Sequence, residues 1–202
     1  MNKEKELIDK LIDLAFAEDI GDGDHTTLSC IPATAMGKSK LLIKEAGVLA
    51  GIEVAKEIFN RFDPSMKVEV FINDGTEVKP GDVAMIVEGK VQSLLQTERL
   101  MLNVMQRMSG IATMTRKYAR QLEGTHTRVL DTRKTTPGMR ILEKMAVKIG
   151  GGVNHRIGLF DMILLKDNHV DFAGGIDKAI TRAKEYCKET VSYTHLTLPT
   201  IL

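Results

Sequence analysis

Apolar residues in the first part of the chain are spaced as in a helix and then as in strands. Leu7, Leu11 and Leu14 share one face of a helix predicted over residues 5–17. The pattern then predicts a strand over residues 38–49 and a helix over residues 52–62. A second strand, half-buried, is predicted over residues 67–72. Residues from about 20 to 90 therefore indicate a compact α+β unit.

Glycine-rich segments divide these elements. Segment 18–27 is acidic and rich in glycine, and we interpret it as a loop that orders a domain edge. A calcium site is the alternative, but the spacing lacks the glutamate that an EF-hand loop requires at its twelfth position. Asp74-Gly75 and Pro80-Gly81-Asp82 are turn signals that flank short strands.

The middle of the chain changes to a helical pattern. Leucine and methionine residues recur on one face over residues 92–108, which predicts a long amphipathic helix with methionines filling its core. Ser109-Gly110 is expected to end this helix, and a second one is predicted over residues 112–122.

From Arg128 onward the pattern alternates between strand and helix. Val129-Leu130 predicts a short strand, and Thr136 is expected to cap a helix that begins at Pro137. Glycines at residues 150–152 are expected to end this helix. A strand buried on both faces is predicted over residues 162–165, and a further helix over residues 176–188. Repeated βα units indicate a parallel sheet or barrel, whose functional sites gather at the C-terminal ends of its strands.

Composition narrows the class of protein. The 202 residues are 43% hydrophobic and 27% charged with a net charge of +1, so no global field would recruit nucleic acid or an anionic membrane. Cys30 and Cys187 are far apart, and we interpret them as reduced thiols. The N-terminus lacks a signal sequence and no apolar run could span a bilayer, so we expect a cytoplasmic protein.

Basic residues concentrate at the ends of the predicted βα strands and in the loop between them. They are Arg133, Lys134, His155, Arg156 and Lys166. Because guanidinium and ammonium groups bind carboxylate and phosphate, this cluster predicts a pocket for a ligand with several negative charges. Lys144 and Lys148 are expected to be solvated on a helix surface, and the role of Arg140 stays open.

These segments closely resemble the quinolinate phosphoribosyltransferase family. The resemblance lies mainly in residues 131–140 (DTRKTTPGMR), 150–156 (GGGVNHR) and 162–169 (MILLKDNH). Segment 18–27 (EDIGDGDHTT) resembles the family's N-terminal signature, and residues 97–113 resemble its helical linker. The similarity extends over about residues 5–188.

The resemblance implies an α/β fold with an N-terminal α/β sandwich domain followed by an α/β barrel. It implies transfer of phosphoribose from phosphoribosyl pyrophosphate to quinolinate with decarboxylation, which yields nicotinate mononucleotide, pyrophosphate and CO₂. Mg²⁺ is the implied cofactor. The family builds its site across a dimer, so a homodimer or higher homo-oligomer is implied.

The resemblance also implies roles for individual residues. The carboxylates of quinolinate would be bound by Arg133, Lys134, His155 and Arg156, with Thr132 beside them. Lys134 and Lys166 would face the phosphoribosyl group as the catalytic residues. Arg99 would reach the active site of the neighbouring subunit.

The chain after Arg128 is too short for a complete barrel, so we expect a truncated barrel. The predicted organisation is an N-terminal domain with its helical linker over residues 1–110 and a partial barrel over residues 111–189. Residues 190–202 are predicted to be a non-native tail. The ligands for Mg²⁺ and the phosphate-binding loops would lie in the missing C-terminal part, so we do not expect full turnover by this chain.

The sequence leaves two other functions open. A paralogous phosphoribosyltransferase-like protein linked to molybdenum transport shares the fold, although the pairs Arg133-Lys134 and His155-Arg156 favour the quinolinate enzyme. A non-catalytic anion-binding module would bind dicarboxylates without turnover.

Overall fold

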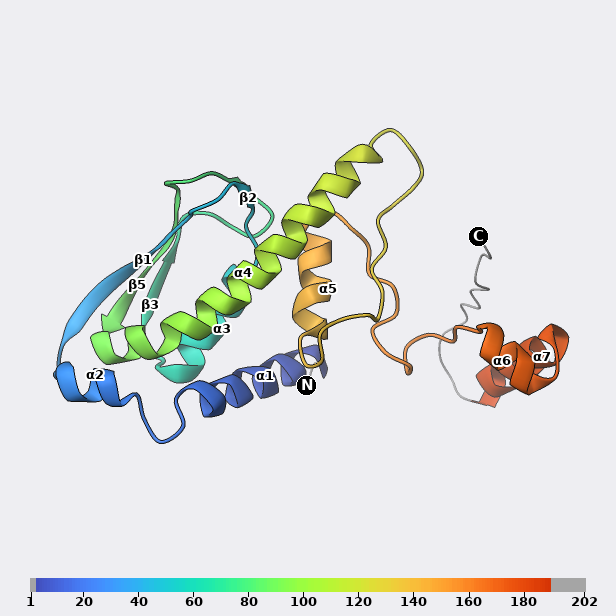
Figure 1. Ribbon diagram of the computed structural model, residues 1–202, viewed down its shortest axis with the longest axis horizontal. Coiled ribbons are helices and arrows are strands. Elements are labelled where there is room, and N and C mark those ends of the chain that lie inside the picture. Colours follow the sequence, from blue (N-terminus) through green and yellow to red (C-terminus); the bar gives the residue numbers. More distant parts are fainter. Residues whose placement is uncertain (1–2, 190–202) are drawn as a thin grey trace. The chain divides into compact units, whose positions relative to one another are not determined.

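The computed structural model describes residues 3–189, which divide into two compact units, one up to Asn154 and one from His155 onward (Figure 1). The first unit contains α1 (Lys3–Asp19), α2 (His25–Cys30), β1 (Met36–Leu42), β2 (Gly47–Val48), α3 (Ile52–Phe62), β3 (Lys67–Val70), β4 (Glu77–Val78), β5 (Val83–Lys90), α4 (Val91–Gln121) and α5 (Arg140–Ile149). The second unit contains α6 (Asp167–Ala173) and α7 (Ile176–Glu189). The tail predicted at residues 190–202 lies outside the described residues.

Several predicted elements are confirmed. The helix over residues 52–62 is α3, and the helices predicted at residues 5–17 and 176–188 are α1 and α7 with slightly longer ends. The loop predicted over residues 18–27 is shorter, because His25 begins α2. Asp24 Oδ1 caps that helix by accepting a hydrogen bond from Thr27 N at 3.0 Å.

Three antiparallel strands form the main sheet in the order β1-β5-β3, and β2 pairs separately with β4. The single strand predicted over residues 38–49 is therefore wrong, since β1 ends at Leu42 and β2 begins at Gly47. Pairing with β5 shifts register at Leu41/Leu42, and Val48 N then donates to Thr113 Oγ1 of α4 at 2.8 Å. After Leu42 the chain therefore no longer pairs with β5, and at Val48 it contacts α4.

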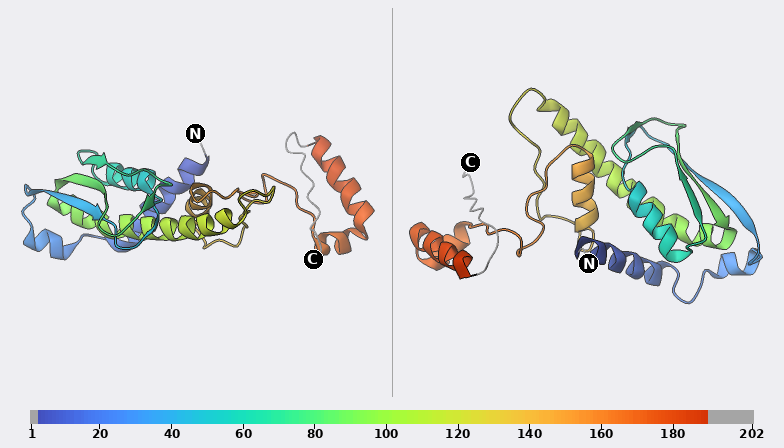
Figure 2. Two further views of the ribbon diagram at one scale, coloured as in Figure 1. Left: turned by 90° about the horizontal axis from the view of Figure 1, so that it is seen from above. Right: turned by 180° about the vertical axis from the view of Figure 1, so that it is seen from behind.

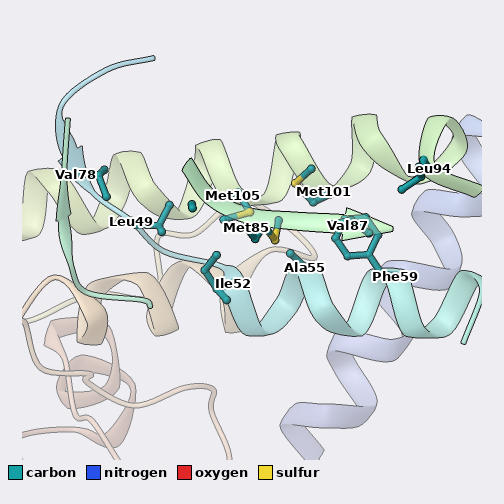
Figure 3. Packing of buried hydrophobic residues seen from close by; sticks show 11 residues of the cluster. Leu49, Ile52, Ala55, Phe59, Val78, Met85, Val87, Leu94, Met101 and Met105 are labelled. Atoms are coloured by element: carbon teal, nitrogen blue, oxygen red, sulfur yellow. The ribbon is translucent and has the colours of Figure 1, made fainter. Parts of the chain in front are cut away.

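One hydrophobic cluster fills the space between the main sheet and two helices. It joins Met85 of β5 to residues of α3 and α4, as Figure 3 shows for Ile52, Phe59, Met101 and Met105. Burial of each such side chain stabilises the fold by roughly 1.5–3 kcal/mol. The amphipathic pattern of α3 therefore fixes which face of the sheet it covers.

A second cluster lies on another side of α4. It brings together buried residues of α1, α3, α4 and α5: Ile12, Val54, Ile58, Val104, Met108, Ala112, Leu142 and Ala146, among others. Figure 2 shows from two further sides that α3 and α5 both lie next to α4, with α5 crossing it at an angle. Helix α4 thus connects the sheet with the segment that carries the predicted site.

Helix α4 is continuous, so the break predicted at Ser109-Gly110 is wrong. Ser109 Oγ accepts from Ala50 N at 2.9 Å and donates to Ala50 O at 3.1 Å. Met108 and Ala112 are completely buried on either side of Gly110. This packing outweighs the cost of one glycine in a helix interior, about 1 kcal/mol.

Helix α5 begins at Arg140, not at the predicted Pro137. Thr136 O accepts from Met139 N at 3.0 Å in a turn before the helix, and Thr136 N donates to Glu143 Oε2 at 3.3 Å. The predicted glycine stop is confirmed, since Gly150 caps the helix and Gly151 has a φ of +95°. Arg116 of α4 donates through Nε to Gly150 O at 3.0 Å.

The chain on either side of α5 forms one parallel bridge, Leu130 to Val153. Asp131 N donates to Val153 O at 3.1 Å, and Val153 N donates to Val129 O at 2.8 Å. This is a short βαβ unit, the repeat that builds a parallel barrel. Asp131 and Asn154 immediately follow the bridged residues.

The strand predicted at residues 162–165 is reduced to an isolated β-bridge at Leu164, and of this run only Leu165 is buried. Within residues 155–189 the regular elements are the helices α6 and α7. Helix α6, which follows it, was not predicted. No helix in the described range is both long and apolar enough to cross a membrane.

Replacing Gly150 with alanine tests the approach of α5 to α4. An added Cβ would lie 2.5 Å from Ala112 O and 2.7 Å from Thr115 Cβ, so we expect a loss of about 1–3 kcal/mol in the free energy of unfolding. Gly110→Ala is the matched control, because its Cβ would meet nothing within 4 Å and should stabilise α4 by up to about 1 kcal/mol. Urea denaturation measures both changes, and equal effects would contradict this packing.

Candidate functional site

The loop that follows the first strand of the βαβ unit carries three predicted site residues, Thr132, Arg133 and Lys134. Thr132 Oγ1 accepts from Lys134 N at 3.1 Å, which forms a tight turn. The side chains of Thr132 and Lys134 are exposed and that of Arg133 is half-buried. Arg133 Nε is buried without a hydrogen-bond partner among the described residues. A ligand oxygen that reached this donor would remove the cost of leaving it unpaired.

Helix α5 holds this loop through Arg140 and Glu143. Arg140 donates through Nε to Thr135 Oγ1 at 3.0 Å and through Nη2 to Arg133 O at 3.4 Å. The open question about Arg140 is thereby answered in part, since its guanidinium supports the backbone of the loop.

A second support comes from α4. Arg107 donates through Nε and Nη2 to Glu143 Oε1, at 3.1 and 2.6 Å, and through Nη2 to Thr136 Oγ1 at 2.7 Å. Glu143 is buried, and its other oxygen accepts from Thr136 N. The end of the loop is therefore tied to the helix that joins the two hydrophobic clusters.

Lys144 is buried, so its expected position on a solvated surface is wrong. Its side chain is 3% exposed and its Nζ lies 2.5 Å from Asp131 Oδ1, whose side chain is 7% exposed. With its amide oriented to satisfy its neighbours, Asn154 donates to Asp131 Oδ2 and to Lys144 O, both at 2.9 Å. We call these three residues the strand-end network, because Asp131 and Asn154 end the two bridged strands.

The second unit contains the other predicted cations. Arg156 is buried and donates through Nη1 to Met162 O at 3.1 Å, which ties the start of this segment to its later part. Asp161 accepts from Ile157 N at 2.7 Å and from Gly158 N at 2.8 Å, which closes the intervening loop. His155 is half-buried. Lys166 is exposed, and its backbone N donates to His169 Nδ1 at 2.9 Å at the start of α6.

The predicted site residues belong to both units. Arg99, Thr132, Arg133 and Lys134 lie in the first, and His155, Arg156 and Lys166 lie in the second. Within the first unit, the structure shows a supported loop with an available guanidinium donor. The convergence of all these side chains on one ligand stays a prediction.

No group of three or more histidine, cysteine, aspartate or glutamate side chains within residues 3–189 is placed to bind a metal ion. Two carboxylates beside the loop 132–136 are engaged, Asp131 by Lys144 and Asn154 and Glu143 by Arg107. The described residues therefore do not fit Mg²⁺.

The roles of Arg107, Glu143 and the strand-end network were not predicted from the sequence. A signal for part of it exists, because an acidic residue that directly follows a short buried strand needs a cationic or polar partner. Lys144 lies among apolar residues on α5. The helix connects two parallel strands and must pack against the strand that precedes it, which brings Lys144 near the end of that strand. Arg107 carries no such signal, since its partner is 36 positions away.

Two family models match this chain, and both describe domains of the same family. The family model for the quinolinate phosphoribosyl transferase N-terminal domain matches residues 24–109, and that for the C-terminal domain matches residues 111–197. Quinolinate phosphoribosyltransferase [decarboxylating] 1b of Nicotiana tabacum is 48% identical over 181 residues, which are 89% of this chain and 51% of the relative. A probable nicotinate-nucleotide pyrophosphorylase [carboxylating] of Synechocystis is 43% identical over 89% of this chain and 60% of the relative.

Solved structures give the same result. NadC from Streptococcus pyogenes matches with a TM-score of 0.87 and 39% identity, over 95% of this chain and 67% of that one. The nicotinate-nucleotide pyrophosphorylase from Francisella tularensis matches with a TM-score of 0.84 and 38% identity, over 92% of this chain and 66% of that one. These matches confirm the predicted fold class. The chain spans about half the length of the plant relatives that it matches.

Loss of the Lys144 ammonium should destabilise the fold strongly. Lys144→Ala would leave the Asp131 carboxylate buried without its cation, which typically costs about 3–5 kcal/mol. Lys148→Ala is the control, because Lys148 is exposed one turn later on α5 and its removal should change stability by no more than about 0.5 kcal/mol. Chemical denaturation followed by circular dichroism measures both, and a small loss for Lys144→Ala would contradict the buried pair.

Proposed function

The chain belongs to the quinolinate phosphoribosyltransferase family, and on this premise we propose that it serves the transfer of phosphoribose to quinolinate. The donor would be phosphoribosyl pyrophosphate, and the products would be nicotinate mononucleotide, pyrophosphate and CO₂. This reaction belongs to the biosynthesis of NAD. The names of the relatives, which include decarboxylating and carboxylating enzymes of this kind, support the proposal.

The observation that carries the proposal is the loop 132–136 with its unpaired donor. Among residues 3–189, buried Arg133 Nε has no hydrogen-bond partner, and the neighbouring Lys134 is exposed. A guanidinium binds a carboxylate through two parallel hydrogen bonds, and an ammonium adds a compact positive charge. Quinolinate offers two adjacent carboxylates, so a cationic loop of this kind suits one side of the molecule.

The second unit supplies the complementary cations in this proposal. Arg156 donates one of its guanidinium N–H groups to Met162 O, which fixes the plane of its side chain. Together with His155, it would bind the other carboxylate of quinolinate. Lys166 and Lys134 would face the phosphoribosyl group, and Thr132 would contact the substrate beside Arg133.

These residues would act by orientation and charge. The pyridine nitrogen attacks the anomeric carbon of the ribose while the bond to pyrophosphate breaks, and the ring becomes cationic. Loss of CO₂ from the adjacent carbon then leaves a carbanion, which the cationic ring stabilises until it takes up a proton. Fixed cations hold the diacid in place and reduce repulsion between its carboxylates. Excess charge at the departing carboxylate would oppose its loss, so placement matters more than total charge.

Mg²⁺ remains part of the proposal for the whole protein, where it would neutralise charge on the departing pyrophosphate. We propose no step that depends on it, because the described residues do not fit a metal ion.

We also propose a homodimer or higher homo-oligomer in a cytoplasmic location. Arg99 supports the oligomer, because it is exposed on α4 and makes no hydrogen bond or ion pair with the described residues. In a dimer its guanidinium would be available to the neighbouring subunit's site.

Removal of the loop cations should weaken quinolinate binding. Arg133→Met and Lys134→Met should each raise the Kd by about 10–100-fold, because each deletes a charge-assisted hydrogen bond worth about 1.5–3 kcal/mol. Isothermal titration calorimetry gives the Kd, and thermal melting verifies that each variant is folded. Lys148→Met, an exposed cation on the same unit, should bind as the unmodified chain does. Absence of quinolinate binding, or equal binding by all variants, would overturn the proposed function.

A further inference from the structure

We propose that Arg107 and Glu143 are positioning residues for anion binding, although neither needs to touch the ligand. Together with Thr136 they form what we call the loop clamp, which fixes the end of the loop 132–136 and thereby the direction of the Arg133 guanidinium. The inference rests on the function proposed above, and it concerns the first unit alone.

Each member of the loop clamp bonds to the other two. Arg107 donates through Nη2 to Glu143 Oε1 at 2.6 Å and to Thr136 Oγ1 at 2.7 Å. Thr136 N donates to Glu143 Oε2 at 3.3 Å, so each oxygen of the carboxylate has its own donor. Thr136 is therefore held both at its backbone and at its hydroxyl, which restricts any shift of the loop end.

The clamp is anchored in the core through α4. Arg107 lies three positions after Val104 and directly before Met108, and both of these are buried in the cluster shared with α1 and α5. A rotation of α4 would expose them, so the base of the Arg107 side chain cannot move freely. The clamp thus extends the rigidity of a packed helix to a loop without regular structure, which ends only where α5 begins at Arg140.

The clamp also governs what the loop can offer to Arg133. Each threonine hydroxyl of the loop already accepts a hydrogen bond: Thr132 Oγ1 from Lys134 N, Thr135 Oγ1 from Arg140 and Thr136 Oγ1 from Arg107. Arg133 Nε is buried and has no partner within the part of the chain that the structure describes. A loop free to move could bring one of its own oxygens to this donor, and such a bond would compete with a ligand.

Stability alone does not account for the clamp. The side chain of Arg107 is 49% exposed, and an ion pair with so exposed a partner contributes little net stability because water screens it. Burial of the Glu143 carboxylate is costly unless its oxygens are bonded. What this arrangement supplies beyond stability is direction, since its bonds leave Thr136 in one orientation.

The expected consequence is a preorganised anion site. When the loop is already ordered, a ligand that binds Arg133 does not have to order it. When the clamp is broken, binding must also restrict the loop, and the lost conformational entropy appears as a higher Kd.

Thr136→Val is the decisive variant, because it removes the hydroxyl at similar volume and keeps the backbone N–H. Isothermal titration calorimetry should show its Kd for quinolinate raised by about 3–10-fold, as for one lost hydrogen bond. Thr136→Ser keeps the hydroxyl and should bind within about twofold of the unmodified chain. Thr127→Val is the matched control and should bind normally, because Thr127 is an exposed threonine whose hydroxyl makes no hydrogen bond within residues 3–189.

Arg107→Lys separates positioning from stability. The lysine keeps the charge beside Glu143, but a single ammonium cannot reproduce the fork that holds Glu143 and Thr136 together. We expect the Kd for quinolinate to rise by about tenfold, as for one lost charge-assisted hydrogen bond. A clamp that only stabilised the fold would lower the urea midpoint and leave the Kd of the folded protein unchanged, and that result would overturn the inference.

The outcomes separate the two proposals. If the unmodified chain does not bind quinolinate, the proposed function fails and the inference fails with it. If the unmodified chain binds quinolinate and Thr136→Val and Arg107→Lys bind it equally well, only the inference is overturned.

Amide hydrogen exchange tests the clamp without any ligand. Thr136→Val and Arg107→Lys should speed exchange in residues 132–136, while α3 stays as protected as in the unmodified chain. Thr136→Ser should retain the exchange rates of the unmodified loop. Unchanged exchange in the loop of both clamp variants would show that the clamp does not order it, and the inference would be wrong.

Discussion

Packing against the two sides of α4 is the constraint on which the arrangement of the first unit depends. Met101 and Met105 face the cluster shared with the main sheet, whereas Met108 and Ala112 face the cluster shared with α1 and α5. The helix must remain unbroken for both clusters to form, and Gly110 is tolerated for that reason. Because α5 packs on this helix, the sheet domain and the first βαβ unit share one rigid support (Figure 1).

Helix α5 carries charged side chains both in the protein interior and at its surface. Glu143 and Lys144 are both buried, one paired with Arg107 of α4 and the other with Asp131 of the preceding strand. These pairs hold the two ends of the loop that carries Arg133 and Lys134. The loop cations can therefore remain available for an anionic ligand, because neighbouring charges have partners of their own.

The sequence predicted elements with a clear apolar period, such as α3, and it located the cationic loop through a long motif. It could not predict that α4 continues through Gly110, since the compensating contacts come from Ala50, about 60 positions earlier. The burial of Lys144 was missed for a similar reason, because its partner lies on another element. The roles of Arg99, His155, Arg156 and Lys166 rest on resemblance to the family and remain predictions.

The central claim is that cations from two separate segments bind one dicarboxylate. The most direct test is a titration with quinolinate of the chain labelled with ¹⁵N at arginine, followed by NMR at the Nε groups of Arg133 and Arg156. The account predicts that both signals shift with a single common Kd and saturate at one ligand per site. Shifts with different Kd values, or a response of only one of the two groups, would contradict it.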